Sequence, residues 1–66
     1  MVDFLLYEFR KERNLTLLEV SKLTGISKTM LNYYENGKTS PRLDVLEEIA
    51  KGLNCKMIDL FESEYK

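Results

Sequence analysis

Apolar side chains return every three or four positions along almost the whole chain, which is the spacing of one face of an α-helix. They fall into five groups: Val2, Leu5, Leu6 and Phe9; Val20 and Leu23; Leu31 and Tyr34; Leu43, Leu46, Ile49, Ala50 and Leu53; and Met57, Leu60 and Phe61. No segment of the sequence alternates with the period of two that is typical of a half-buried strand. The pattern therefore predicts an all-α fold of five short helices.

The residues between the first groups are of the kinds that end and begin helices. Asn14 tolerates the left-handed conformation that would end a first helix near Arg13. Thr16 and Glu19 have the spacing of a capping box, in which the threonine oxygen accepts from the Glu19 amide and the carboxylate accepts from the Thr16 amide. A second helix is therefore expected over residues 17–24.

A glycine and a serine separate the second helix from the third. Gly25 allows a sharp turn, and Ser27 has the side chain of a helix N-cap. The third helix is then expected to run to Asn36 and to stop at Gly37.

The single proline determines where the next helix begins. Pro41 disfavours helical backbone at the residue before it, so residues 38–41 are expected to form a loop. A fourth helix follows over residues 42–53, closed by Asn54, and a short fifth helix occupies residues 56–62.

Length and composition fit one small domain over residues 1–66, with 44% hydrophobic and 32% charged residues. No apolar run approaches the roughly 20 residues of a membrane span, and no charged and then apolar leader opens the sequence. We therefore expect a cytoplasmic protein with no membrane partner.

Several kinds of site chemistry are missing from the chain. One cysteine forms no internal disulfide, and the lack of histidine removes the commonest general base and the commonest neutral metal ligand. The three glycines are isolated and form no phosphate-cradling loop. We expect no enzymatic activity, no cofactor, no metal site and no small-molecule ligand.

The net charge of −1 conceals a difference between the two parts of the chain. Residues 1–42 carry a net charge of +2, whereas residues 43–66 carry −3. Such an asymmetry steers an anionic partner to one face. Ordinary solvated helix surfaces also produce it, so charge alone does not assign a function.

The two short helices expected within residues 16–37 are joined through a turn that contains glycine, which is the helix-turn-helix arrangement of DNA-binding proteins. In the third helix Leu31 and Tyr34 form the inward stripe. The opposite stripe carries side chains of the types that read base edges in the major groove: Lys28, Thr29, Asn32, Tyr33 and Asn36. A solvated helix face is the alternative interpretation. The loop that follows, residues 36–42, offers amides, hydroxyls and two cations of the kinds that bind phosphates.

These residues resemble the helix-turn-helix of the Cro and phage-repressor family, often called the XRE family. The positions that match its pattern are Arg10, Leu15, Thr16, Val20, Gly25, Ile26, Ser27, Leu31, Glu35, Gly37 and Pro41. The resemblance covers about residues 4–62 and implies a five-helix lambda-repressor-like fold. It also implies a transcriptional regulator, in our interpretation a repressor, that binds operator DNA as a homodimer.

The resemblance also assigns residues to parts of the DNA. It places Lys28, Thr29, Asn32 and Tyr33 at bases, and it places Arg10, Ser27, Asn36 and Lys38 at phosphates. It further implies that Arg10 pairs with Glu35 inside the protein. Arg42, directly after the proline, resembles an arginine that some phage repressors insert into the minor groove, where a compressed groove attracts a cation.

The sequence departs from the family pattern at several positions. Leu17 stands where the family has a glutamine that braces the phosphate and the recognition helix. Ser21 and Thr24 replace small and apolar residues, and we expect both hydroxyls to bond back to helix carbonyls. Arg42 replaces the usual serine cap of the fourth helix.

A second function remains open on the same fold, namely a protein-interaction module such as an antitoxin or adaptor. Leu17, the neighbouring Leu18 and the isoelectric point of 5.4 motivate it. For a homodimer, the best candidate surface in the sequence is the acidic segment around the fourth and fifth helices, with Met57, Leu60 and Phe61. Cys55 is expected to be a buried and inert thiol.

Overall fold

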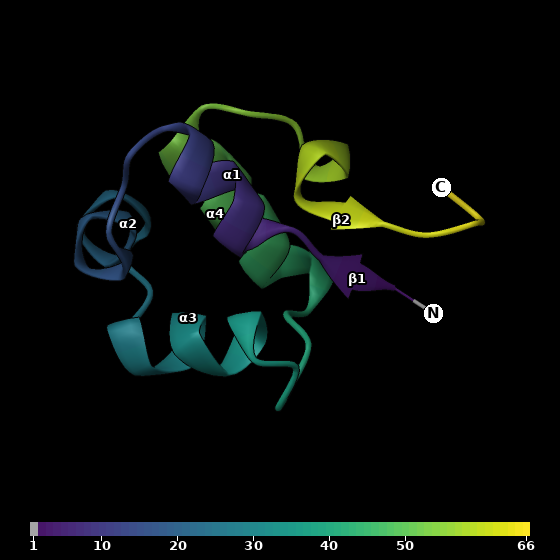
Figure 1. Ribbon diagram of the computed structural model, residues 1–66, viewed down its shortest axis with the longest axis horizontal. Helices are drawn as coiled ribbons and strands as arrows, with labels where there is room; N and C mark the ends of the chain where they lie inside the picture. The colour runs from purple at the N-terminus through teal and green to yellow at the C-terminus, as the bar shows by residue number, and fades with distance from the viewer. Residues whose placement is uncertain (1) are drawn as a thin grey trace.

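The structure, a computed structural model, describes residues 2–66, so the first residue of the expected domain lies outside the described part. The described residues form four α-helices, one 3-10 helix and two short strands (Figure 1). Their bounds are β1 Asp3–Phe4, α1 Leu6–Glu12, α2 Leu17–Thr24, α3 Lys28–Glu35, α4 Leu43–Leu53, η1 Met57–Leu60 and β2 Phe61–Glu62. The first four expected helices are confirmed, with ends within a few residues of the prediction. None of the described helices has the length and apolar content needed to cross a membrane.

The capping box at the start of α2 is present as expected. The Glu19 amide donates to Thr16 Oγ1 at 3.1 Å, and the Thr16 amide donates to Glu19 Oε1 at 2.8 Å. These two bonds satisfy backbone donors that have no partner within the helix. They also lower the pKa of Glu19, first through the bond from the Thr16 backbone amide and then through the Thr16 side chain.

This pKa shift predicts a loss of stability in acid. The lowered pKa means that the Glu19 carboxylate stabilises the folded state above its unfolded-state pKa, and that this contribution disappears as the pH falls through the folded-state value. Glu19→Gln keeps an acceptor for the box but does not titrate in this range. In urea denaturation, the stability advantage of the wild type over Glu19→Gln should therefore shrink as the pH falls below 5. An advantage that is independent of pH would contradict the prediction.

A Schellman motif ends α3. The Gly37 amide donates to the Tyr34 carbonyl at 3.3 Å and the Lys38 amide donates to the Tyr33 carbonyl at 3.0 Å. Gly37 has φ of 74°, a conformation that strains any residue with a Cβ atom. The motif turns the chain back over the end of the helix, and so the side chain of Lys38 returns towards that of Tyr33.

The predicted fifth helix is wrong in type and extent. Residues Met57–Leu60 form a single 3-10 turn, and Phe61–Glu62 are extended and pair with Asp3–Phe4 in an antiparallel ladder. Phe4 lies opposite Phe61, and the Leu5 amide donates to the Leu60 carbonyl at 2.7 Å. Two-residue strands are too short to produce the alternating pattern that identifies a strand in a sequence. The apolar spacing grouped Val2 with the first helix, but α1 begins only at Leu6, so Val2 lies outside the helix and before β1.

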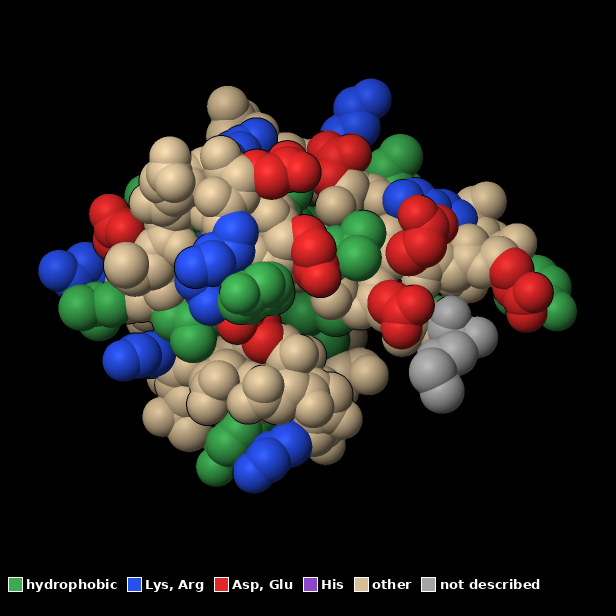
Figure 2. All heavy atoms as spheres, in the orientation of Figure 1, with side chains coloured by type: hydrophobic (Ala, Val, Ile, Leu, Met, Phe, Trp, Pro, Cys, Tyr) green, Lys and Arg blue, Asp and Glu red, His purple; other side chains and the backbone are tan. Residues whose placement is uncertain are grey.

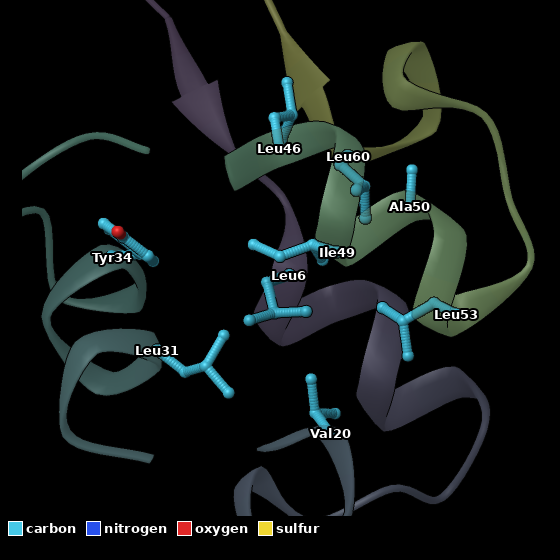
Figure 3. Close-up of a cluster of buried hydrophobic side chains, with 9 residues drawn as sticks. All are labelled: Leu6, Val20, Leu31, Tyr34, Leu46, Ile49, Ala50, Leu53 and Leu60. Atoms are coloured by element: carbon cyan, nitrogen blue, oxygen red, sulfur yellow. The ribbon is translucent and has the colours of Figure 1, made fainter. Parts of the chain in front are cut away.

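Nine buried side chains from the four α-helices and η1 form the core: Leu6, Val20, Leu31, Tyr34, Leu46, Ile49, Ala50, Leu53 and Leu60. Figure 3 shows them converging between the helices, with Ile49 near the middle. Tyr34 faces inward as predicted, and its ring meets that of Phe4 edge to face, with centroids 6.1 Å apart. Leu23 and Leu43 follow the helical spacing, but their side chains are 53% and 75% exposed.

Candidate nucleic-acid interface

Helix α3 forms one side of the molecule, below α1 and α4 in Figure 1. With 100° of rotation per residue, the five candidate residues of α3 and its cap, which are Lys28, Thr29, Asn32, Tyr33 and Asn36, cover an arc of about 140°. All five side chains are exposed, whereas Leu31 and Tyr34 on the opposite side of the helix are buried. The helix thus presents a continuous polar surface to solvent and rests on the core through its apolar stripe.

Two asparagines on this arc contact each other one helical turn apart. Asn36 Nδ2 donates to Asn32 Oδ1 at 3.1 Å. The bond leaves both Nδ2 donors of Asn32 and a second lone pair on its Oδ1 for an outside partner. We expected Asn36 at a phosphate, and the contact adds a role that the sequence reasoning missed, since Asn36 orients the Asn32 amide.

Lys38 and Tyr33 form a second pair at the C-terminal end of the arc. The Lys38 ammonium lies 5.2 Å from the centre of the exposed Tyr33 ring, within the range of a cation–π contact. The Schellman motif produces this approach, because it returns the backbone of Lys38 over the last turn of α3. A positive charge therefore stands beside the polar arc.

Beneath the arc, an ion pair joins α1 to the last turn of α3. Arg10 Nε lies 2.7 Å from Glu35 Oε2 and Arg10 Nη2 lies 3.1 Å from Glu35 Oε1, while Nη1 donates to the Leu15 carbonyl at 3.1 Å. The side chains are only 13% and 6% exposed, and the bond to Glu35 raises the pKa of Arg10. The expected pairing is confirmed. Three donors of the guanidinium form hydrogen bonds within the chain. The main role of Arg10 is therefore to hold the end of α3 in place.

The turn between α2 and α3 is held by two hydroxyls. Thr24 Oγ1 donates to the Val20 carbonyl at 2.8 Å and accepts from the Ile26 amide at 3.2 Å. Ser21 was expected to bond back to its own helix, but its hydroxyl donates forward to the Ile26 carbonyl at 2.6 Å. That part of the prediction is wrong, because the turn brings Ile26 back over α2. Gly25 has φ of 77°, as this tight connection requires.

Ser27 and Arg42 stand at the starts of α3 and α4. Ser27 Oγ accepts from the Met30 amide at 3.2 Å, and its hydroxyl proton remains available to a phosphate. Arg42 begins α4 without a side-chain cap. Its guanidinium lies 3.6 Å from Asp44 Oδ2, and because both groups are largely exposed the pair contributes little. Arg42 is therefore able to reach an outside partner.

A surface hollow opens where the end of α1, the start of α2 and the start of α3 meet. Its lining residues are Arg10, Lys11, Asn14, Leu15, Thr16, Leu17, Leu18 and Lys28. Lys11 and Lys28, 17 positions apart in sequence, both border this hollow. The sequence reasoning counted Lys11 only as a charge, because nothing in its local pattern shows that it lies near α3.

The charges are distributed unevenly over the molecule. In Figure 2 most of the red acidic side chains lie over the upper and right-hand parts of the view, with others at the left edge and near the centre, and the lowest part, over α3, shows blue, green and tan. The acidic residues of α4 and of the segment after it give residues 43–66 their net charge of −3. Fewer acidic side chains on the α3 side mean less repulsion of a polyanion there than over the acidic parts of the surface.

Cys55 lies apart from this surface, between α4 and η1. The side chain is half-buried, and burial raises the pKa of its thiol, with the charge of Asp59 adding to the effect. A thiol with a raised pKa carries little thiolate and reacts slowly. Cys55 is a packing residue, although less completely buried than expected.

With this geometry, comparison with known proteins identifies the family. The helix-turn-helix family HTH_3 matches residues 6–60, from the start of α1 to the end of η1. The chain belongs to this family, and the predicted helix-turn-helix at α2 and α3 is confirmed.

The chain is similar to several regulators. It is 35% identical over 54 residues to an uncharacterized HTH-type transcriptional regulator of Archaeoglobus fulgidus, covering 82% of this chain and 76% of the relative. It is 39% identical over 49 residues to the HTH-type transcriptional regulator SutR of Escherichia coli, covering 74% of this chain and 28% of SutR. The crystal structure of an HTH_3 family transcriptional regulator from Vibrio cholerae matches with a TM-score of 0.77 and 42% identity, covering 79% of this chain and 29% of that one.

The chain is also similar to an antitoxin. It is 35% identical over 51 residues to the antitoxin PezA of Streptococcus pneumoniae, covering 77% of this chain and 32% of PezA. This chain thus spans about a third of PezA and about three quarters of the Archaeoglobus regulator.

Proposed function

We propose that this protein represses transcription by binding a specific double-stranded operator, with the exposed arc of α3 in the major groove. The observation that carries the proposal is the arc itself, which combines exposed polar side chains with an apolar stripe seated on the core. The HTH_3 family and the regulator names of the relatives support the DNA-binding function and point away from an enzyme.

Base reading falls to four residues in this proposal, namely Lys28, Thr29, Asn32 and Tyr33. Asn32 has the amide that pairs bidentately with adenine, and Lys28 donates to the acceptors of guanine. The bond from Asn36 holds the Asn32 amide in one orientation before DNA arrives. Fewer side-chain conformations are then lost on binding, which raises affinity for the matching base.

Contacts to the backbone set the register of α3 on the duplex. We assign phosphates to Ser27, Asn36 and Lys38, with Arg10 contributing only through donors that Glu35 and Leu15 leave free. Lys11 joins this set, because it borders the same hollow as Lys28. Arg42 is assigned to the minor groove, where narrowing concentrates negative potential.

Two copies are expected to bind together, because one recognition helix contacts too few base pairs to select a genomic site. Related half-sites lie about 34 Å apart, one helical turn of DNA. A bound dimer that overlaps a promoter represses by excluding the polymerase.

The test begins with selection from a random duplex library by the purified chain, and continues with titration of the enriched sequence. Asn32→Ala and Lys28→Ala should each weaken binding by about 1–3 kcal/mol at particular base pairs and relax selectivity there. Lys38→Ala should weaken binding to all sequences alike and reduce the slope of log affinity against log salt by about one.

Lys56→Ala is the matched control. Lys56 is exposed directly before η1, and Figure 1 shows the segment that follows α4 on the side of the molecule away from α3. Loss of Lys56 should therefore leave affinity and salt slope unchanged. Equal losses on selected and random duplexes for Asn32→Ala, Lys28→Ala and Lys38→Ala would reject the division between base and phosphate contacts.

A protein-interaction module is the second candidate function. Leu18 is half exposed beside the hollow at the start of α2, and the similarity to the antitoxin PezA favours a protein partner. A folded chain that enriches no duplex sequence and shows no salt-dependent DNA affinity would favour this function. In that case Leu18→Lys should abolish partner binding without unfolding the chain.

A further inference from the structure

We propose that one side of the exposed arc of α3 recognises the C5-methyl group of a pyrimidine, carried either by thymine or by 5-methylcytosine, in the major groove. The inference rests on the proposed operator binding and names a chemical group that this site selects. The side chains concerned are Thr29, Met30 and Tyr33, which we call the apolar edge. Met30 has no part in the operator contacts assigned above, so the inference also adds a residue to the site.

The rotation of the helix separates the apolar edge from the hydrogen-bonding side chains of α3 and its cap. Those side chains lie within about 80° of one another: Lys28, Asn32 and Asn36. The apolar edge begins about 20° further round the helix and covers about 100°. It consists of a threonine methyl group, a thioether chain and an aromatic ring. The helix therefore offers hydrogen bonds on one side of its outer surface and apolar contact on the other.

The apolar edge is open to solvent. Tyr33 is 38% exposed, Met30 is 37% exposed, and Thr29 is exposed as well. In the described part of the chain, neither Met30 nor Tyr33 belongs to the core or to the side chains packed against it. Residues three apart on a helix are neighbours, so these two large side chains form one apolar surface. Packing of the fold does not account for that surface.

Positive charge lies beside the apolar edge. The Lys38 ammonium is 5.2 Å from the centre of the Tyr33 ring, and Lys28 directly precedes Thr29. The lowest part of Figure 2, over α3, likewise shows basic and apolar side chains together. An apolar protein surface would have to desolvate these charges, whereas a duplex offers them phosphates on either side of a groove whose floor carries methyl groups. Charge therefore favours DNA as the occupant of the edge.

The methyl group of thymine lies in the major groove, where apolar side chains contact it. A 5-methylcytosine carries the same group at the same ring position, beside an amino group instead of a carbonyl oxygen. Contact through carbon atoms does not distinguish these two bases, so the apolar edge is expected to accept both. Cytosine and uracil, which lack the methyl group, are expected to bind less tightly.

The test uses the duplex selected by the purified chain and replaces its thymines by uracil, one at a time. At least one replacement should lower the affinity about fourfold, the effect of removing one buried methyl group from the contact. At that position, cytosine paired with guanine should also bind more weakly than thymine, and 5-methylcytosine should recover about fourfold in affinity. Titration followed by fluorescence anisotropy measures each affinity. These changes are made in the DNA and leave the folding of the protein untouched.

Substitutions in the protein locate the contact. Tyr33→Phe keeps the ring and should keep the preference for thymine over uracil, whereas Tyr33→Ala and Met30→Ala should each reduce that preference towards none. Ile58→Ala is the matched control, because it removes an apolar side chain that is 52% exposed on η1, and it should leave the preference unchanged. Circular dichroism shows whether each variant is folded.

The outcomes separate this inference from the proposed function. A selected duplex that binds equally well with uracil in place of every thymine would overturn the inference and leave operator binding standing. A thymine preference that Tyr33→Phe abolishes would also overturn it, because the tyrosine hydroxyl and not the ring would then make the contact. A preference that survives both alanine variants has the same consequence. A folded chain that enriches no duplex would reject the proposed function and this inference together.

Discussion

Replacing Glu35 by alanine is expected to destabilise the protein by about 3–5 kcal/mol, because it leaves the charge of Arg10 without its partner in a poorly solvated place. The two side chains are only 13% and 6% exposed, and the carboxylate accepts two of the three bonds that Arg10 donates within the chain. A domain of this length has a total stability of roughly 3–10 kcal/mol. Urea denaturation followed by circular dichroism should therefore find Glu35→Ala largely unfolded, or close to it, at 25 °C.

Two further variants show whether the unpaired charge is the cause. Arg10→Met combined with Glu35→Leu removes both charges and should recover most of the lost stability, because apolar pairs often replace buried ion pairs without loss. Glu47→Ala removes an exposed carboxylate from α4 and should change the stability by less than about 0.5 kcal/mol. If Glu35→Ala lost no more than Glu47→Ala, water would be solvating Arg10 and the pair would not anchor α3.

Replacing Gly52 by alanine is expected to lower the stability by about 1–3 kcal/mol, the usual range for overpacking. A Cβ atom at this position of α4 would lie 2.6 Å from the Leu23 carbonyl oxygen and 2.9 Å from Thr24 Cα. Both atoms belong to the backbone of α2, which cannot move aside as a side chain does. The helices must separate, and with α2 the whole helix-turn-helix shifts. Thermal denaturation measures the loss directly.

Helix propensity alone would predict the opposite sign for the change in stability of Gly52→Ala. Alanine favours a helix interior over glycine by about 1 kcal/mol, so a chain without the close approach of α2 would be stabilised. Gly25→Ala is a useful comparison, because its Cβ would meet open space and any loss arises from the positive φ alone. Increased stability of Gly52→Ala would show that α2 and α4 lie further apart than described.

The local elements of this fold could be predicted from the sequence because their causes lie within a few residues. The capping box joins Thr16 to Glu19, Gly25 and Gly37 supply positive φ angles at the ends of α2 and α3, and Asn54 ends α4 in the left-handed conformation. The order of α2, turn and α3 follows from these local bonds. The polar arc of α3 follows from the helical repeat.

The sequence by itself thus determined the four helices, the helix-turn-helix and the residues offered to DNA, since hydrogen bonds and rotation within one or two turns produce them. Only the tertiary structure decided what happens between distant segments. It paired Phe4 with Phe61 where a helix was expected, and it left Leu43 exposed beside them. Burial of Leu60 in the core draws the last residues back to the first ones, and no short-range pattern in the sequence records such a contact.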